Sequence, residues 1–437
     1  MFSEFPNAVY FVGIGGVSMS ALALLLHDRG IRVRGSDAKE GEYTRLLRER
    51  GVSVHIGESE LISEDVVVYT GAATFLQPQL AAAKRAGKRL IPRAELLGRI
   101  AEEFPSVISV AGCHGKTSTT SMLSHIFARA RRAFTCHIGG EDAAFGNYYS
   151  SGGEIFLTEA CEFQRSFLFL KSSVAVILNT DLDHSDCYRS QEELTRAYEE
   201  FARRADRVIV NADDVRAREI PHALSFGLHT GDLFASELSS DRETYAFTVM
   251  EKSVPLVRIK LNVPGIFQIY NALAAFAAAR LCGSSAEEAR LGLEDFRGVK
   301  RRFERIGTFG GVPVVCDYAH HPREIAATLQ TAEKLCRGTV RLVFQPHTYT
   351  RTRDFMKEFV EALKKAESPI VYKTFAAREK FEFEGSAAAL LARIPEARYA
   401  QTPSQLKKRL AENLGRDDLI LVLGAGDIYD VANAITD

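Results

Sequence analysis

Short apolar runs alternate with helix-patterned segments along most of the chain. The runs cover residues 8–12, 31–34, 65–70, 88–91, 107–111, 154–158, 174–178, 207–210, 312–315, 340–344 and 419–423. Runs rich in β-branched residues are typical of strands buried on both faces of a parallel sheet. Segments such as 19–28, 189–204 and 269–281 have the spacing or composition of helices. Residues 225–263 differ, because shorter β-like segments alternate there with turns. The pattern predicts an α/β fold with parallel sheets and a small antiparallel sheet in the middle.

The segment after the run at 107–111 has the composition of a phosphate-binding loop. Its sequence, GCHGKTS, covers residues 112–118 and leads into a helix-patterned segment. Backbone N–H groups at a helix N-terminus can surround phosphate oxygens, Lys116 can reach the β- and γ-phosphates, and the Thr117 hydroxyl can bind Mg²⁺. The strict motif has Gly where this chain has Val110, so the loop is a shortened variant. A glycine-containing turn with a surface lysine is the alternative interpretation.

The first third carries a weaker nucleotide-binding signal. GIGGVS, residues 13–18, follows the first apolar run and resembles the dinucleotide-binding fingerprint, with Asp37 at about the expected distance. Ser18 stands at the third fingerprint position, where Gly or Ala is usual. A phosphorylated ligand at this helix N-terminus and a tight turn without a ligand both explain the pattern. Arg93 follows the run at 88–91 and can face a phosphate or carboxylate, although a surface salt bridge is the common alternative.

Acidic residues follow two strands of the middle third. Glu159 and Glu162 come after the run at 154–158, and NTDLDH, residues 179–184, comes after the run at 174–178. Carboxylates beside a Lys-Thr loop suit Mg²⁺ that is also bound to ATP phosphates, whereas either acid alone is more often solvated or helix-capping. Asn271 lies in the apolar helix at 269–281 and needs a polar partner, either a base edge or a backbone group.

Polar clusters follow three strands of the last third. They are DYAHHP at 317–322, QPHTYTRTR at 345–353 and GAGD at 424–427. Such clusters suit a second nucleotide or substrate surface at the carboxyl edge of a sheet. The basic run KRRFER at 300–305 has the composition usually found on a solvated surface.

Composition restricts the class of protein. The chain has 437 residues, about three domains by length, with 46% hydrophobic and 25% charged residues. A formal net charge of -1 argues against duplex DNA or an anionic membrane as a partner. The seven cysteines form no C-x-x-C pair, which indicates reduced thiols rather than a zinc site or disulfides. We find neither a signal peptide nor an apolar span of 18 residues, and we expect a cytoplasmic protein with no nucleic-acid or membrane partner.

The ordered motifs resemble those of the Mur ligase family, the ATP-dependent amide-forming synthetases of peptidoglycan precursors. They are GIGGVSMS, GCHGKT, TEACE, NTDLDH, the Asn271 helix, RRFE, DYAHHP, FQPHTYTRTRD and GAGD. The first motif and the pair DYAHHP and FQPHTYTRTR resemble the alanine-adding member. The resemblance implies a Rossmann-like UDP-sugar domain at 1–104, a central P-loop ATPase domain at 105–299 and a Rossmann-like amino-acid-binding domain at 300–437. It also implies a monomer or weak homodimer.

The resemblance assigns roles residue by residue. The ATP-binding residues would be Gly112, Cys113, His114, Gly115, Lys116, Thr117, Ser118, Asn271, Arg302 and Asp317. The Mg²⁺ ligands would be Thr117, Glu159 and His184. The UDP-sugar residues would be Gly15, Ser36, Asp37, Thr70, Arg93 and His114. The L-alanine residues would be His347 and Arg351. Lys116, His184 and Arg302 would be catalytic.

The implied reaction joins L-alanine to the lactyl carboxylate of UDP-N-acetylmuramate. The carboxylate attacks the γ-phosphate of ATP, and the alanine amine displaces phosphate from the resulting acyl phosphate. A muropeptide-recycling ligase that adds a tripeptide to the same sugar nucleotide is the nearest alternative. An NAD(P)-dependent oxidoreductase would explain GIGGVS and Asp37 but not Lys116, Glu159 and His184. A non-catalytic nucleotide-binding module is disfavoured by the metal-ligand set.

The chain departs from the family pattern at four places. EACEFQ, residues 159–164, replaces a common EADESD stretch, and Phe267-Gln268 replaces a common His-Asn pair near adenine. Thr348 stands where an Arg is common beside the motif histidine, and Glu58 stands where a His is common near uridine. The chain has no Lys between 172 and 210, so we expect no carbamylated lysine there.

Overall fold

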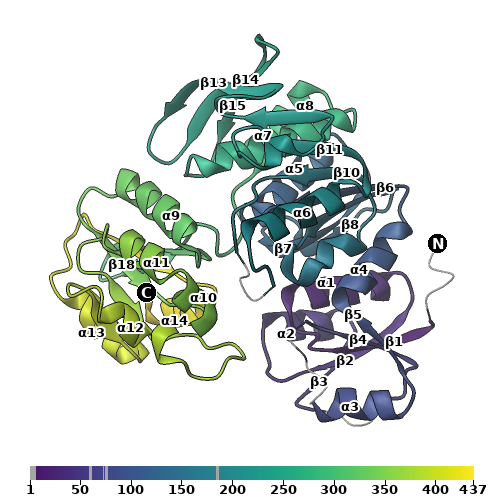
Figure 1. Cartoon of the computed structure of the whole chain (residues 1–437), viewed down its shortest axis with the longest axis horizontal. Helices are drawn as coiled ribbons and strands as arrows, with labels where there is room; N and C mark the ends of the chain where they lie inside the picture. The colour runs from purple at the N-terminus through teal and green to yellow at the C-terminus, as the bar shows by residue number, and fades with distance from the viewer. Residues whose placement is uncertain (1–5, 59–61, 72, 74–76, 184–186) are drawn as a thin grey trace. The chain divides into compact units, whose positions relative to one another are not determined.

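The computed structural model describes residues 6–58, 62–71, 73, 77–183 and 187–437. The chain forms two compact units. The first comprises Met1–Thr180, Thr195–Phe234 and Ala272–Leu293, and the second comprises Asp181–Leu194, Ala235–Asn271 and Glu294–Asp437. The described residues form three sheets with flanking helices, which confirms the predicted α/β class (Figure 1).

A five-stranded parallel sheet contains the N-terminal residues. Its order is β3-β2-β1-β4-β5. Its strands are β1 (Ala8–Val12), β2 (Arg32–Asp37), β3 (Ser53–Ile56), β4 (Val66–Tyr69) and β5 (Arg89–Pro92). Its helices are α1 (Val17–Asp28), α2 (Glu42–Glu49), α3 (Pro78–Arg85) and α4 (Arg93–Glu102). Leu80 of α3 packs against Tyr10 and Val67, and the alternation of strand side chains places Val9 and Val66 on the opposite face.

The predicted strands of the middle third lie in a ten-stranded sheet of order β15-β14-β13-β12-β11-β10-β6-β9-β7-β8. Its strands are β6 (Ser106–Ala111), β7 (Phe134–Asp142), β8 (Gly146–Ser150), β9 (Ile155–Ala160), β10 (Ser172–Ile177), β11 (Ala205–Asn211), β12 (Leu224–Gly227), β13 (Leu233–Ser240), β14 (Tyr245–Glu251) and β15 (Val254–Leu261). The helices of this part are α5 (Lys116–Arg129), α6 (Gln191–Ala202), α7 (Phe267–Leu281), α8 (Ala286–Asp295) and the short 3₁₀ helices η1 (Phe163–Phe169) and η2 (Ala217–Glu219). The strands around β6 are parallel, so their carboxyl ends meet at one edge.

The antiparallel excursion expected over 225–263 begins later than the sequence pattern indicated. Strands β14 and β15 pair antiparallel, as expected. Strand β12 instead pairs in parallel with both β11 and β13, so the expectation is wrong for this strand. A succession of short β-like segments and turns does not specify the direction of each pairing, and the parallel pairing of β12 with β13 covers only Phe226 with Leu233 and Gly227 with Phe234. Asp213 accepts hydrogen bonds from the backbone N–H groups of Leu228 and His229 and so holds the loop between these two strands.

The C-terminal residues form a six-stranded sheet of order β16-β17-β21-β18-β19-β20, in which only the pairing of β16 with β17 is antiparallel among the described residues. Its strands are β16 (Glu304–Phe309), β17 (Val312–Asp317), β18 (Val340–Phe344), β19 (Ile370–Tyr372), β20 (Arg398–Ala400) and β21 (Leu419–Leu423). Its helices are α9 (Pro322–Leu335), α10 (Tyr349–Asp354), α11 (Met356–Leu363), α12 (Ala387–Leu391), α13 (Pro403–Ala411), α14 (Ile428–Ile435) and the 3₁₀ helix η3 (Phe383–Gly385). Leu421 and Val422 of β21 point into two different cores, which explains the uninterrupted apolar run.

Within the described residues, no helix has both the length and the apolar character that a membrane crossing requires.

Candidate active site

The predicted strand, glycine loop and helix are present between β6 and α5. Gly112 follows β6 with φ of +138°, and a Cβ there would lie 2.9 Å from Cβ of Leu178. Gly115 has φ of +86° and immediately precedes α5, which begins at Lys116. Only glycine adopts both conformations without strain. The loop therefore turns sharply and directs the N-terminus of α5 toward the carboxyl edge of the sheet.

Lys116 is held inside this loop by a buried carboxylate. Its Nζ donates to Oε2 of Glu162 at 2.9 Å and to the carbonyl oxygen of Gly112 at 2.5 Å. The side chain of Glu162 is 1% exposed and that of Lys116 is 14% exposed. Burial lowers the pKa of Lys116, but the charge of Glu162 opposes it and the pKa ends above its ordinary value. Lys116 is therefore a fixed positive charge, and Glu162 is a site residue whose role the sequence did not indicate.

Asn179 clamps the phosphate loop to the neighbouring strand. Its Oδ1 accepts from the backbone N–H of His114 and its Nδ2 donates to the carbonyl oxygen of the same residue, both at 3.0 Å. Strand β10 runs parallel to β6, and Asn179 follows it closely. The sequence placed Asn179 at a strand end but gave it no role. An amide that occupies both backbone groups of one residue fixes the loop in a single conformation.

The predicted metal ligands Thr117 and Glu159 come from adjacent elements. Glu159 pairs with Val110 across β9 and β6, and its Oε1 accepts from the N–H of Gly139 at 2.5 Å. Thr117 is buried in the first turn of α5. The third predicted ligand, His184, lies outside the described residues. Among the described residues, no three His, Cys, Asp or Glu side chains gather as a metal site. Mg²⁺ at nucleotide sites takes most of its ligands from phosphates and water, so one hydroxyl and one carboxylate fit its requirements.

The predicted UDP-sugar residues meet at the carboxyl edge of the N-terminal sheet. Oδ2 of Asp37 accepts from the N–H of Gly15 at 2.9 Å, and Ser36 Oγ donates to Gln79 at 2.9 Å. A Cβ on Gly13 would lie only 2.6 Å from Cγ2 of Thr70. Because Gly13 has no side chain, the turn can lie close to the end of β4.

Arg93 begins α4 at the same edge. Its Nη1 donates to Ser18 Oγ at 3.1 Å. The structure thus brings Gly15, Ser36, Asp37, Thr70 and Arg93 to one sheet edge, and it places His114 in the phosphate loop.

Asn271 is bonded to a neighbouring side-chain amide. Its Nδ2 donates to Oε1 of Gln268 at 3.0 Å, and both side chains are buried. Gln268 occupies one of the positions where this chain departs from the family pattern. The two side-chain amides therefore form a pair on α7.

Arg302 and Asp317 lie together beside Tyr318. The Arg302 guanidinium lies 4.8 Å from the Tyr318 ring centroid. Asp317 accepts from the N–H groups of Phe303 and Ala319, both at 2.7 Å. Burial raises the pKa of Asp317 to about 6, although the charge of Arg302 opposes this shift. The carboxylate thus fixes the loop that precedes β16 and keeps the two predicted nucleotide residues adjacent.

The basic run at 300–305 is not a solvated surface, so that expectation is wrong for its central arginines. Arg301 lies between the rings of Tyr318 and Tyr429, at 4.8 and 5.2 Å, and donates to the carbonyl oxygen of Gly426 at 3.0 Å. Guanidinium groups stack on aromatic rings, a contact that periodicity along the sequence does not reveal.

His347 and Arg351, the predicted amino-acid residues, are in contact. Nη1 of Arg351 lies 3.2 Å from Nδ1 of His347, whose ring stacks on Phe375 with centroids 5.5 Å apart. Burial, with smaller contributions from the neighbouring His320 and Arg351, lowers the pKa of His347 to about 3. The ring is therefore neutral and can accept a hydrogen bond from Arg351.

Two carboxylates hold the helix that carries Arg351. Asp183 accepts from Nε of Arg351 at 3.1 Å, and the side chains of Asp183 and Arg351 are 5% and 11% exposed. Glu379 Oε2 accepts from the backbone N–H groups of Tyr349 and Thr350 at 2.5 and 2.9 Å, in the first turn of α10. Neither role was evident from the sequence.

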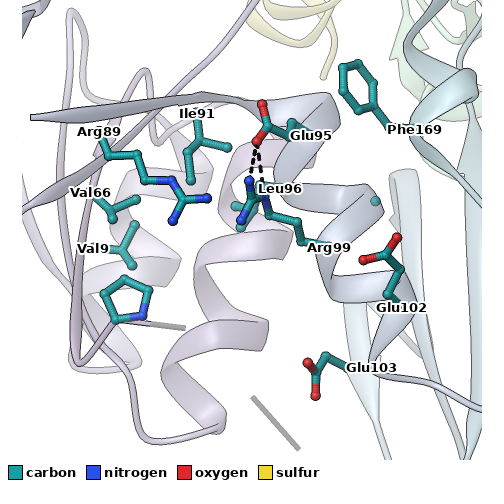
Figure 2. Close-up of a pocket in the computed structure, with 12 residues that line it drawn as sticks. Val9, Val66, Arg89, Ile91, Glu95, Leu96, Arg99, Glu102, Glu103 and Phe169 are labelled. Carbon is teal, nitrogen blue, oxygen red and sulfur yellow. Dashed lines mark hydrogen bonds and ion pairs between the residues drawn. The ribbon is translucent and has the colours of Figure 1, made fainter. Parts of the chain in front are cut away.

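A cavity of about 490 Å³ lies at the opposite edge of the N-terminal sheet (Figure 2). Val9 and Val66, near the starts of their strands, form part of its wall with Leu96 of α4 and Phe169 of η1. Its lining contains none of the residues that the sequence predicts for substrates. Ligands of open α/β sheets bind at the carboxyl ends of the strands, so we assign the chemistry to that edge instead.

Comparison with known proteins identifies a single family along the chain. The model of the Mur ligase family catalytic domain matches residues 8–105, that of the Mur ligase middle domain matches 110–279, and that of the Mur ligase glutamate ligase domain matches 301–426. A UDP-N-acetylmuramate–L-alanine ligase of Caldicellulosiruptor bescii is 37% identical over 97% of this chain and 96% of its own length. One of Acetivibrio thermocellus is 39% identical over 97% of this chain and 94% of its own length.

Solved structures give the same result. The UDP-N-acetylmuramate-alanine ligase of Thermotoga maritima superposes with a TM-score of 0.86 at 27% identity, covering 98% of each chain. A murein peptide ligase of Psychrobacter arcticus superposes with a TM-score of 0.75 at 22% identity, covering 98% of each chain, which shows a shared fold.

Proposed function

The chain belongs to the Mur ligase family, and we propose that it joins L-alanine to UDP-N-acetylmuramate with conversion of ATP to ADP and phosphate. One observation carries the choice of substrates: the relatives named for this reaction match the chain from end to end at 35 to 39% identity. The proposed role is in peptidoglycan precursor synthesis in the cytoplasm. The proposed domains are 1–104 for the sugar nucleotide, 105–299 for ATP and 300–437 for the amino acid.

The phosphate loop would bind ATP through its backbone and its lysine. The N–H groups at the start of α5 face the edge where the strands end, which suits phosphate oxygens. Lys116 would leave Glu162 for the γ-phosphate, and Arg302 would neutralise charge on the same group in the transition state. Thr117, Glu159 and His184 would hold Mg²⁺, which supplies charge neutralisation on the phosphates when it is bound. Attack by the lactyl carboxylate then gives an acyl phosphate.

The other two substrates would bind at the two remaining sheet edges. Gly15, Ser36, Asp37 and Thr70 shape the turn that would receive uridine diphosphate, and Arg93 would face its phosphates. Arg351 already contacts the carboxylate of Asp183, which supports a role in binding the carboxylate of L-alanine. His347 orients the same guanidinium. Much of the rate would come from holding three charged reactants in register.

The test is release of phosphate from ATP by the full chain with UDP-N-acetylmuramate and, in separate reactions, L-Ala, L-Ser, Gly or a tripeptide. We expect release that depends on both the sugar nucleotide and L-Ala. Release with the tripeptide alone would assign the recycling reaction instead, and no dependence on any amino acid would refute the ligase function.

Lys116→Ala tests the phosphate loop in the same assay. We expect turnover to fall by at least about 100-fold, because a cation that stabilises the transition state is removed. Lys171→Ala is the matched control, since Lys171 is an exposed lysine of the same unit. Full turnover in Lys116→Ala would exclude the loop from the reaction.

A further inference from the structure

A buried histidine connects the sugar-nucleotide turn with the strand that carries Glu159. His137 lies on β7 and is 3% exposed. Its Nε2 lies 2.8 Å from Oγ of Ser18, at the start of α1, and its Nδ1 lies 2.9 Å from Oγ1 of Thr158, on β9. Neither the proposed reaction nor the family motifs explain this ring. Ser18 is also the residue that departs from the nucleotide-binding fingerprint.

The chemistry of the neighbouring groups sets the direction of each hydrogen bond. Arg93 can only donate, and its Nη1 donates to Ser18 Oγ at 3.1 Å. The single hydrogen of Ser18 is then directed to Nε2 of His137, so the ring carries its proton on Nδ1 and donates it to Thr158. Thr158 in turn donates to the carbonyl oxygen of Glu159 at 3.2 Å. In the reverse direction Ser18 would accept from both His137 and Arg93, and no side chain of the described residues would take its own hydrogen.

The ring is neutral, as this arrangement requires. Burial and, to a lesser extent, the positive charge of Arg93 lower the pKa of His137 to about 3. A neutral imidazole has one donor and one acceptor, and in this arrangement Nδ1 donates to Thr158 and Nε2 accepts from Ser18. The buried ring therefore has no unsatisfied polar atom and no freedom to change tautomer without breaking a bond.

We propose that His137 is a positioning residue for the sugar nucleotide: by taking the hydrogen of Ser18 it fixes the lone pairs that orient Arg93 toward the diphosphate. This inference rests on the proposed function. A hydroxyl rotates freely unless its hydrogen has a fixed acceptor. With His137 as that acceptor, Ser18 always presents a lone pair to Arg93. Gly or Ala at position 18 would offer Arg93 no acceptor, which gives a reason for the departure from the fingerprint.

Kinetics of two variants separate positioning from folding. His137→Val removes the acceptor and leaves the half-buried Ser18 hydroxyl and the buried Thr158 hydroxyl without the ring, so we expect KM for UDP-N-acetylmuramate to rise about 10- to 100-fold. His137→Gln places an amide oxygen near the position of Nε2 and should restore most of that loss. KM for L-alanine should change by less than about twofold in both variants. Combining Ser18→Ala with His137→Val should add little to either single effect, because both break the same link.

The control is His125→Gln. His125 is a mostly buried histidine of the same unit, bonded to Asp142 at 3.0 Å, and it lies outside the proposed binding residues. This variant should lower thermal stability without raising KM for the sugar nucleotide. An unchanged KM in His137→Val, or a rise of the same size in His125→Gln, would overturn the inference.

Histidine ¹⁵N NMR of the whole chain tests the bond directions without an activity assay. The resonances lost in His137→Gln should belong to a neutral ring protonated on Nδ1 at pH 7. Protonation on Nε2 would overturn the proposed directions. If the wild-type chain releases no phosphate with UDP-N-acetylmuramate, the proposed function fails as a whole. If the wild-type chain is active and the His137 variants have the same KM for UDP-N-acetylmuramate as the wild-type chain, this inference alone fails.

Discussion

Replacing Glu162 by Gln would change the partner of the phosphate-loop lysine while keeping the size of the side chain. Oε2 and Oε1 of Glu162 lie 2.9 and 3.3 Å from Nζ of Lys116. Both side chains are largely withdrawn from solvent. The pair therefore differs from a surface salt bridge, which contributes little to stability.

The geometry sets the size of the effect. Two unit charges 2.9 Å apart attract by about 6 kcal/mol at an effective dielectric constant of about 20. Much of this offsets the cost of burying both charges, and removing one partner of such a pair costs about 3–5 kcal/mol. Gln keeps an oxygen that accepts from Nζ, and the Gly112 carbonyl also remains as an acceptor. We therefore expect Glu162→Gln to lower the free energy of unfolding by about 2–3 kcal/mol.

The same change should strengthen ATP binding. In the wild-type chain the phosphates must compete with Glu162 for Lys116, and in the variant they compete with a neutral amide. We expect Kd for a non-hydrolysable ATP analogue to fall by about tenfold, which corresponds to about 1.4 kcal/mol. The pKa of Lys116 is raised, so the contribution of the pair is complete below about pH 10 and is lost only as pH rises through the higher folded pKa. Measurements near pH 8 report it in full.

Thermal unfolding without nucleotide and calorimetric titration with the ATP analogue measure the two effects. Glu154→Gln is the matched control, because Glu154 is exposed and lies just before β9. The two effects should have opposite signs in Glu162→Gln and be absent in the control. If Glu162→Gln unfolds at the temperature of the control and binds the analogue no more tightly, the buried pair does not restrain Lys116 and the reasoning is refuted.

Three further predictions concern the other buried contacts. Asn179→Ala removes both bonds to His114 and should raise KM for ATP by about tenfold, as measured by steady-state kinetics; an unchanged KM would show that the clamp is dispensable. Glu379→Gln weakens the hold on the first turn of α10 and should raise KM for L-alanine by about tenfold, whereas Glu382→Gln, at an exposed ion pair, should not. Burial lowers the pKa of His320 from 6.5 to about 4, so its contribution to stability is complete above pH 6.5 and is lost as pH falls through about 4. His320→Gln should therefore flatten the fall of the unfolding free energy between pH 6.5 and 4 in urea titrations, and a slope equal to that of the wild-type chain would contradict the shift.

Strands were predictable from the sequence where both of their faces are buried. Residues 107–111 and 419–423 read as continuous apolar runs and correspond to β6 and β21, which are central in their sheets. Strand ends were less predictable, because pairing extends beyond the apolar residues. The run at 31–34 becomes β2, which reaches Asp37 since Ser36 and Asp37 pair with β3. Polar residues at such positions carry no hydrophobic signal.

The site was predictable where a residue directly follows a strand. Lys116 and Glu159 were placed together because parallel strands end at the same edge of a sheet, and the register of β6 with β9 agrees. Contacts between distant segments were not predictable. Ser18 and His137 are 119 residues apart, and no local pattern links them. The pair of Asn271 with Gln268 shows the same limit at short range, since a side-chain partner three residues away looks like any other polar residue in a helix.

Lys116, Arg351 and Arg93, three of the cations proposed to act on substrate anions, are each already bonded to an acceptor of the chain itself. Lys116 contacts Glu162, Arg351 contacts Asp183, and Arg93 contacts Ser18. A buried cation without an acceptor would destabilise the fold by several kcal/mol, so each needs such a contact before substrate arrives. Substrate binding then exchanges one acceptor for another, which lowers the net affinity but keeps each cation close to its working position. Groups held in this way need little reorganisation during the reaction, and electrostatic stabilisation of a transition state depends on that property.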